Sequence, residues 1–111
     1  MEIQDSRLND LVVIKITGEI DAITAPQITE HIRQHIEQGN IKLITDLNDV
    51  PYTSSAGLRV FLAAVKETRF KNGDMRLANI QKDVMKVLTL TGFTNILKIF
   101  PDVDAAVQSY A

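Results

Sequence analysis

The sequence predicts an α/β fold with a mixed, mostly parallel sheet of four to five strands and about four helices. Segments rich in β-branched residues alternate along the chain with segments of helical periodicity. Strands separated by helices usually join a parallel sheet through right-handed crossovers. A chain of 111 residues without a linker or an internal repeat is also typical of one domain, here residues 1–111.

A hairpin is expected at the start of the chain. Residues 11–17 form a strand, because apolar β-branched residues recur there with a period of two: Val12, Ile14 and Ile16. Ile3 indicates a preceding strand, and Asn9 and Asp10 supply the turn between the two. This hairpin adds an antiparallel strand to the sheet and makes it mixed.

The next segment predicts a helix over residues 24–38 followed by a strand over residues 41–47. Pro26 suits the first helical turn, where its missing N–H costs no hydrogen bond, and Gly39 ends the helix. Isoleucines recur every fourth residue along one face of this helix: Ile28, Ile32 and Ile36.

The second half of the chain repeats the alternation. A helix is expected over residues 55–69, with apolar residues spaced at i, i+3, i+4 and i+7: Leu58, Phe61, Leu62 and Val65. A strand over residues 75–78 and a helix over residues 83–90 follow. The last expected elements are a strand over residues 96–100 and a helix over residues 102–110.

Composition excludes several functions. The chain has no cysteine, which removes disulfide scaffolds, thiolate zinc sites and cysteine nucleophiles. Twelve basic residues against 14 acidic ones give a net charge of −2, unlike the basic excess of a direct nucleic-acid binder. No segment approaches the roughly 20 apolar residues of a membrane span. Nor does the start of the chain resemble a secretory signal, so we expect a cytoplasmic protein.

The most informative segment runs from Asp46 to Leu58, where a strand ends and small polar residues open a helix. Ser54 or Ser55 can cap that helix, because a serine oxygen accepts from an unpaired amide at a helix N-terminus. Gly57 permits the first turn to approach a neighbouring backbone. The serines are either only a cap and its neighbour or the site of a phosphoryl group, which the helix dipole and free amides would favour.

This segment resembles the signature of the STAS domain, in particular that of the bacterial anti-sigma-factor antagonists. The resemblance rests on a first block with Asp46-Leu47, Val50, Tyr52-Thr53 and the helix start Ser54–Leu58, and on a second block formed by Gly18–Asp21 and Thr24-Ala25. The order of strands and helices fits this family over essentially the whole chain.

The resemblance implies partner switching. The unphosphorylated antagonist binds an anti-sigma factor that is itself a serine kinase, and so frees a sigma factor for transcription. The kinase then phosphorylates a serine of the antagonist, and a metal-dependent (PP2C-type) serine phosphatase restores it. On this pattern the protein is a substrate and a ligand, not an enzyme, and it needs no cofactor and no metal.

By the same resemblance Ser55 occupies the phosphorylated position. Many antagonists have Asp directly before it, whereas this chain has Ser54, so Ser54 is the second candidate and Thr53 a more distant third. The expected docking surface lies around the helix start and the turn before the first helix: Asp21, Thr24, Ser54, Ser55, Gly57, Leu58 and Arg59. The i, i+3 and i+4 spacing of Leu58 favours a core position instead.

Two other functions compete with this interpretation, and the first is an enzyme that uses a metal ion or a serine nucleophile. His31 and His35 have an i, i+4 spacing that metals use, but no glutamate lies between them and no cysteine completes a site, so we interpret them as a partly solvated helix side. Neither serine lies in a Gly-x-Ser-x-Gly hydrolase motif. The second alternative is a STAS module that acts as a sensor, a scaffold or a subunit of an ATP-driven transporter, although a free-standing module favours the antagonist.

Overall fold

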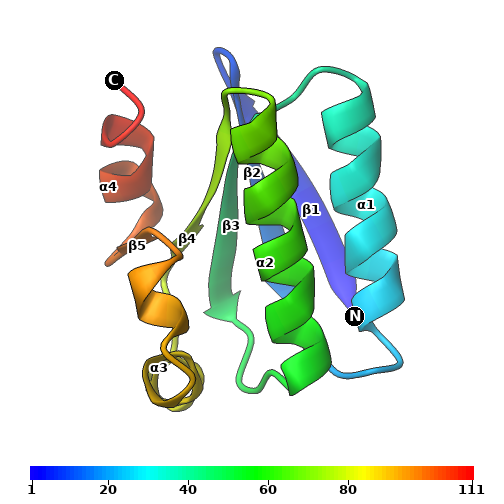
Figure 1. Cartoon of the computed structure of the whole chain (residues 1–111), viewed down its shortest axis with the longest axis vertical. Helices are drawn as coiled ribbons and strands as arrows, with labels where there is room; N and C mark the ends of the chain where they lie inside the picture. The colour runs from blue at the N-terminus through cyan, green and yellow to red at the C-terminus, as the bar shows by residue number, and fades with distance from the viewer.

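The computed structural model describes residues 1–111 and contains a five-stranded mixed sheet. The strands are ordered as in the sequence, and only the first two pair in antiparallel fashion (Figure 1). Their bounds are β1 Glu2–Leu8, β2 Leu11–Thr17, β3 Lys42–Asp49, β4 Asp74–Ala78 and β5 Ile99–Phe100. The expected hairpin and the mixed, mostly parallel sheet are therefore confirmed.

Four α-helices and one 3₁₀ turn connect and flank the strands. They are α1 Ala25–Glu37, α2 Ser55–Phe70, α3 Lys82–Leu90, the 3₁₀ turn Phe93–Asn95 and α4 Val103–Gln108. The first three helices begin and end within one residue of the expected positions. No helix combines the length and the apolar character needed to cross a membrane.

The end of the chain differs from the expectation. Only Ile99 and Phe100 of the expected strand 96–100 pair with β4. The backbone N–H groups of Ile96 and Leu97 donate instead to the carbonyl oxygen of Phe93, which closes the 3₁₀ turn. The final helix has six residues rather than nine, and the Asp102 side chain caps it by accepting from the amide of Ala105 at 2.8 Å.

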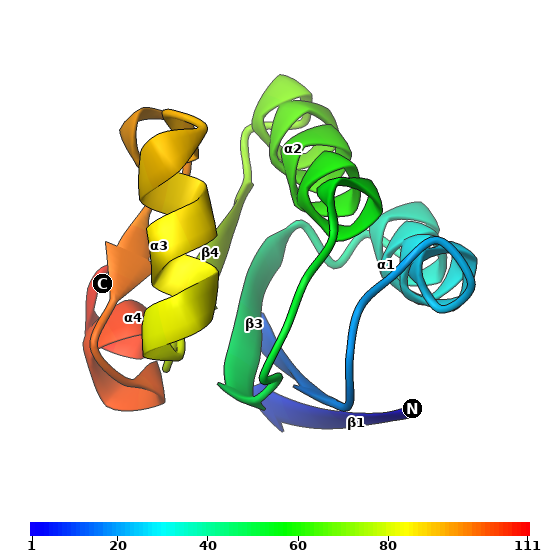
Figure 2. The ribbon, with the colours of Figure 1, turned by 90° about the horizontal axis from the view of Figure 1, so that it is seen from below.

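The sheet carries three helices on one face and one helix on the other. Successive parallel strands are added in one direction, and right-handed crossovers then place their helices on the same face. Accordingly α1, α2 and α3 pack on the face that carries Val12, Ile14 and Ile16. Helix α4 packs on the opposite face against Leu11, Val13 and Ile44. Figure 2 shows α1 and α2 side by side on one side of the sheet, and α4 on the other side of β4.

Candidate functional site

The candidate site lies where β2 and β3 end and α1 and α2 begin, at the lower end of the molecule in Figure 1. Parallel strands present their connecting loops at this carboxyl edge, which is where such sheets usually bind ligands. Seen from below, the β2–α1 and β3–α2 connections run side by side (Figure 2). The two blocks of sequence that carry the STAS resemblance therefore meet in space.

Backbone hydrogen bonds join these two connections. The amide of Gly18 donates to the carbonyl of Asp49 at 3.0 Å, and the amide of Ile20 donates to the carbonyl of Tyr52 at 3.0 Å. The amide of Ser54 then donates back to the carbonyl of Ile20 at 2.8 Å. The parallel pairing of β2 and β3 thus continues beyond the strands, and it fixes the start of α2 beside the turn that begins at Asp21.

Gly57 permits a close approach at this junction, but to side chains and not to the neighbouring backbone that the sequence predicts. A Cβ atom at this position would lie 2.1 Å from Thr53 Oγ1 and 2.6 Å from Ile20 Cγ2. Both neighbours are themselves buried, so they have no room to withdraw. The neighbours are side chains of the two connections, and the glycine lets α2 begin directly against them.

The two candidate serines have different environments. Ser54 is the N-cap residue of α2, is half-buried, and accepts through Oγ from the amide of Ala56 at 3.2 Å. Ser55 is the first residue of the helix and is exposed, and its hydroxyl has no hydrogen-bond partner within the protein. The amides of Ser55 and Gly57 also have no acceptor. The structure therefore separates a capping hydroxyl from an accessible one.

Asp21 and Thr24 form a compact hydrogen-bonded turn before α1. Asp21 Oδ1 accepts from the amides of Thr24 and Ile23, each at 2.9 Å, and the amide of Asp21 donates to Thr24 Oγ1 at 2.9 Å. These hydrogen bonds stabilise the ionised form of the Asp21 carboxyl group, and the bond from the Thr24 amide contributes most. They therefore hold the pKa of Asp21 below its usual value. Asp21 therefore shapes the turn beside Ser55.

The other expected docking residues lie at different depths. Arg59 is exposed, and it stands four residues after Ser55, so both lie on one face of α2. Gly57 is buried, and Leu58 is only 3% exposed and belongs to the core. The core position that the spacing of Leu58 favours is confirmed, which leaves its side chain unavailable to a partner.

Two exposed apolar side chains at the site are not among the docking residues expected from the sequence, although Tyr52 belongs to the segment that resembles the STAS signature. Ile23 is 87% exposed in the turn after Asp21, and Tyr52 is 51% exposed just before Thr53. Isolated exposed apolar residues are common. These two, however, belong to the two connections that are hydrogen-bonded to each other at the start of α2. They give this polar loop region an apolar component.

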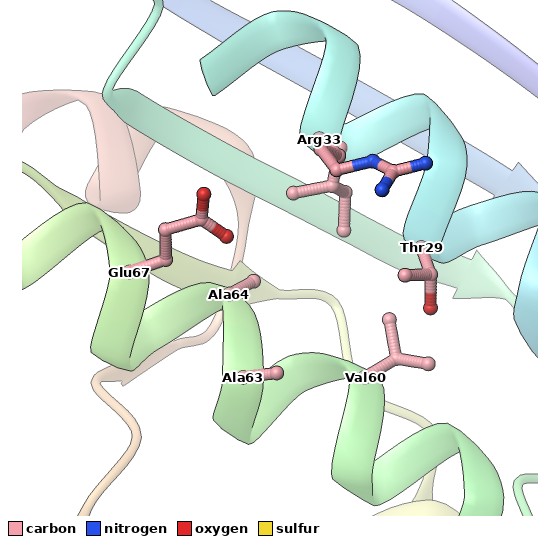
Figure 3. Close-up of a pocket in the computed structure, with 7 residues that line it drawn as sticks. Thr29, Arg33, Val60, Ala63, Ala64 and Glu67 are labelled. Carbon is pink, nitrogen blue, oxygen red and sulfur yellow. The ribbon is translucent and has the colours of Figure 1, made fainter. Parts of the chain in front are cut away.

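A groove between α1 and α2 begins at this site. Its wider end has a volume of about 530 Å³ and includes Ala22 and Ala56, the latter directly after Ser55. It continues between the helices as a narrower cavity of about 60 Å³, where Arg33 and Glu67 stand on opposite walls (Figure 3). Small side chains leave this space open because they do not fill the gap between the two helices.

The two histidines lie on the side of α1 that faces β1, not at the serines. His31 Nε2 lies 2.8 Å from Asp5 Oδ1, and His35 Nε2 lies 2.8 Å from Asp5 Oδ2. Burial acts to raise the pKa of Asp5, but hydrogen bonds from His31 and His35 outweigh it and hold that pKa below its usual value. The sequence argument considered only glutamate and cysteine as further ligands, and it missed Asp5.

The comparisons with known proteins agree with this fold and show the family. The STAS domain family matches residues 2–106, and the chain therefore belongs to this family. The anti-sigma-B factor antagonist of Bacillus subtilis is 34% identical over 100 residues, which are 90% of this chain and 90% of that protein. The resemblance to the antagonists within the family is confirmed.

Solved structures share the fold. An anti-sigma factor antagonist from Mycobacterium paratuberculosis superposes with a TM-score of 0.85 at 22% identity, covering 97% of this chain and 92% of that one. The Bacillus cell fate determinant SpoIIAA in its phosphorylated form superposes with a TM-score of 0.75 at 22% identity, covering 99% and 100%. At these identities the likeness supports the fold and nothing finer.

Proposed function

We propose that this protein is an anti-sigma-factor antagonist whose partner binding is switched by phosphorylation of Ser55. Membership of the STAS family and the antagonists among its relatives support the first part. The observation that supports phosphorylation of Ser55 is that its hydroxyl, in the first turn of α2, is exposed and makes no hydrogen bond within the protein. A kinase needs such an accessible hydroxyl, and a partner that contacts it would detect its modification.

The docking surface is centred on Ser55. It combines the Asp21–Thr24 turn, the α2 start at Ser54 and Ser55, and the exposed Arg59. Ile23 and Tyr52 supply apolar contact area from the two connections, and the groove between α1 and α2 extends the surface away from the serines. Interfaces of this kind commonly place apolar anchors within a polar rim. Gly57 and Leu58 act beneath this surface by holding the start of α2 in place.

Ser55 is the better candidate for modification because Ser54 Oγ is occupied as a cap. A phosphoryl group on Ser55 carries about −1.5 to −2 charge. The free amides of the first helical turn and the Arg59 side chain, at i+4, would stabilise that charge within this protein. The fold therefore tolerates the modification, while a partner surface that packs on Ser55 must desolvate the new charge.

In this mechanism the protein catalyses nothing. An anti-sigma factor that is a serine kinase is its partner, and its release of a sigma factor follows from binding. The same kinase transfers the γ-phosphoryl group of ATP to Ser55 Oγ, which loses its proton, and ADP leaves. A PP2C-type phosphatase hydrolyses the phosphoserine with water. This cycle requires a cytoplasmic location, where both enzymes and the sigma factor would meet it.

Phosphosite mapping tests this assignment. The chain is incubated with the cognate anti-sigma factor kinase and ATP, and the modified residue is located by mass spectrometry. One phosphoryl group on Ser55 is expected in the wild-type chain and in Ser54→Ala, and none in Ser55→Ala. Ser6→Ala serves as a matched control, because Ser6 is also exposed but lies on β1. Phosphorylation of the Ser55→Ala variant at Ser54 would contradict the assignment of Ser55 as the modified serine.

Identification of the partner tests the class of function. Purified chain that captures an ATP-binding serine kinase supports the antagonist. Capture of an ATP-driven permease, with no phosphoryl transfer to the chain, would contradict it and favour a transport-associated STAS module.

A further inference from the structure

A cluster of three potential metal ligands joins the edge strand β1 to helix α1. It consists of Asp5, His31 and His35, and their ligand atoms all lie within 4.8 Å of one another. His31 and His35 are on one face of α1 because they are four residues apart. Asp5 pairs with Ile14 in the hairpin, so its side chain lies on the helix-bearing face of the sheet. The fold thus brings together residues separated by 26 and 30 positions.

We propose that the Asp5–His cluster binds a borderline divalent transition-metal ion of the zinc type. Two imidazole nitrogens and one carboxylate form a donor set that such ions prefer, whereas Mg²⁺ and Ca²⁺ favour oxygen ligands. Three protein ligands leave the remaining coordination positions to water. The proposed metal site is independent of phosphorylation at Ser55.

The positions of the donor atoms suit this ion. Both histidines direct the same nitrogen, Nε2, at the carboxylate: His31 lies 2.8 and 2.9 Å from the two oxygens of Asp5, and His35 lies 2.8 Å from one. Ligand atoms around a tetrahedral zinc ion lie about 3.3 Å apart, given bonds of about 2.0 Å. The donors need only a small outward shift to admit an ion in place of the hydrogen-bonded protons.

The surroundings provide access and room for water. The three side chains are partly exposed, at 34% for Asp5, 28% for His31 and 14% for His35. They line a cleft of about 180 Å³ that contains no apolar residue, and Gln34 and Gln38 complete its wall. A hydrated ion can therefore enter from solvent, and its bound waters have polar neighbours.

Asn40 controls the orientation of the His35 ring. Its Nδ2 lies 3.1 Å from His35 Nδ1, while its Oδ1 accepts from Arg7 at 2.9 Å. A metal on Nε2 requires the ring proton on Nδ1, and metal-bound histidines normally donate that proton to an acceptor. The Asn40 amide must then turn its oxygen towards the ring. Asn40 is thus a positioning residue, and a carboxylate in its place would accept from both neighbours.

The ion would fasten β1 to α1. Strand β1 is the edge of the sheet and pairs only with β2. A ligand that binds only the folded chain raises its apparent stability as the ligand concentration increases. Metal binding therefore predicts a thermal unfolding temperature that rises with Zn²⁺ concentration, and stronger hydrogen-exchange protection in β1.

Zinc titration of the untagged full chain tests the site, with a chromophoric chelator as competitor. We expect one Zn²⁺ per chain, and binding at least about tenfold weaker in Asp5→Asn, His31→Gln and His35→Gln. Asp10→Asn is the matched control. Asp10 is an exposed residue in the same hairpin, but its carboxylate pairs with Lys42 and not with the histidines. Circular dichroism checks that each variant is folded. Equal affinity in the wild type and the His31→Gln, His35→Gln double variant would overturn the proposal.

Asn40→Asp provides a second test, because a purely structural role of Asn40 would not predict tighter Zn²⁺ binding by this variant. This variant should bind Zn²⁺ several-fold more tightly, because the introduced carboxylate accepts the Nδ1 proton of metal-bound His35 without a change of orientation. Replacement of Zn²⁺ by Co²⁺ should give visible d–d absorption bands with the wild-type chain and not with the double variant. Weaker Zn²⁺ binding by Asn40→Asp would contradict coordination through His35 Nε2.

Discussion

The amide of Ser54 donates a 2.8 Å hydrogen bond to the carbonyl of Ile20, the residue directly before Asp21. This single bond connects the cap of α2 to the turn that begins α1. Ser54 then uses its own hydroxyl to cap the helix, which leaves Ser55 as the accessible serine. The position of Ser55 against the docking surface therefore depends on the pairing of two loops that lie more than 30 residues apart in the sequence.

The two serines should differ in their effect on stability. Ser54→Ala removes the acceptor for the Ala56 amide, and loss of a serine cap costs about 1 kcal/mol of the free energy of unfolding. Ser55→Ala removes only an exposed, unbonded hydroxyl and should leave stability unchanged. Urea denaturation of the two variants measures this difference, and a larger loss in Ser55→Ala would contradict the assignment of the cap.

Gly57→Ala should destabilise the fold although alanine favours helices. The added Cβ would lie 2.1 Å from Thr53 Oγ1 and 2.6 Å from Ile20 Cγ2, so the start of α2 must shift. Overpacking of this kind typically costs about 1–3 kcal/mol. The free energy of unfolding should fall by this amount relative to Ser55→Ala, a control in the same helical turn. A Gly57→Ala variant as stable as this control would show that the contact is not tight.

Asp21 should make stability depend on pH. The folded-state pKa of Asp21 lies below its unfolded value, because the carboxylate accepts from the Thr24 and Ile23 amides. The contribution of Asp21 to the free energy of unfolding is therefore fully present above the pKa of about 3.9 in the unfolded chain. It is lost as the pH falls through the pKa in the folded chain. Asp21→Asn keeps the Oδ1 acceptor but not the charge.

The wild-type chain should be more stable than Asp21→Asn at pH 7, and this difference should vanish in strong acid. Thermal unfolding at a series of pH values measures both chains under the same conditions. A difference that stays constant from pH 7 to strong acid would rule out the charge of Asp21 as its source.

Tyr110 should anchor α4 to the sheet. Its hydroxyl lies 2.8 Å from the carbonyl oxygens of Leu43 and Asp74, and Arg76 stacks on its ring at 3.9 Å. Tyr110→Phe keeps the ring but leaves the two carbonyls without this donor, at a cost of about 1–2 kcal/mol. Hydrogen exchange should show that this variant loses more protection in α4 than in α2. Unchanged stability and protection would mean that the hydroxyl contributes nothing.

Local patterns predict much of this fold. The period-two residues of β2 and the isoleucines of α1 each face the core as their spacing indicates, because burial of a single face produces both patterns. The sequence also predicts the start of α2 at Ser55. The sequence leaves open which serine caps the helix, because either hydroxyl oxygen could accept from the free amides. In the structure the hydrogen bond from the Ser54 amide to the Ile20 carbonyl places Ser54 at the cap position.

The remaining differences arise from contacts between distant residues. The segment from Ile96 to Phe100 has strand composition, but the Phe93 carbonyl takes up two of its amides. Nothing near His31 indicates Asp5, which becomes its neighbour only through the hairpin register and the packing of α1 on the sheet. A strand alternation extended from Ile3 would have placed Asp5 on the correct face.

The central claim is that modification of Ser55 controls partner binding. The most direct measurement is the dissociation constant of the cognate anti-sigma factor for the unphosphorylated chain and for the chain phosphorylated at Ser55. Desolvating the added charge should weaken binding by about a thousandfold, equivalent to ~4 kcal/mol. Ser55→Asp should weaken it in the same direction, and Ser55→Ala should bind like the wild type. Equal affinities of the phosphorylated and unphosphorylated chains would contradict the switch.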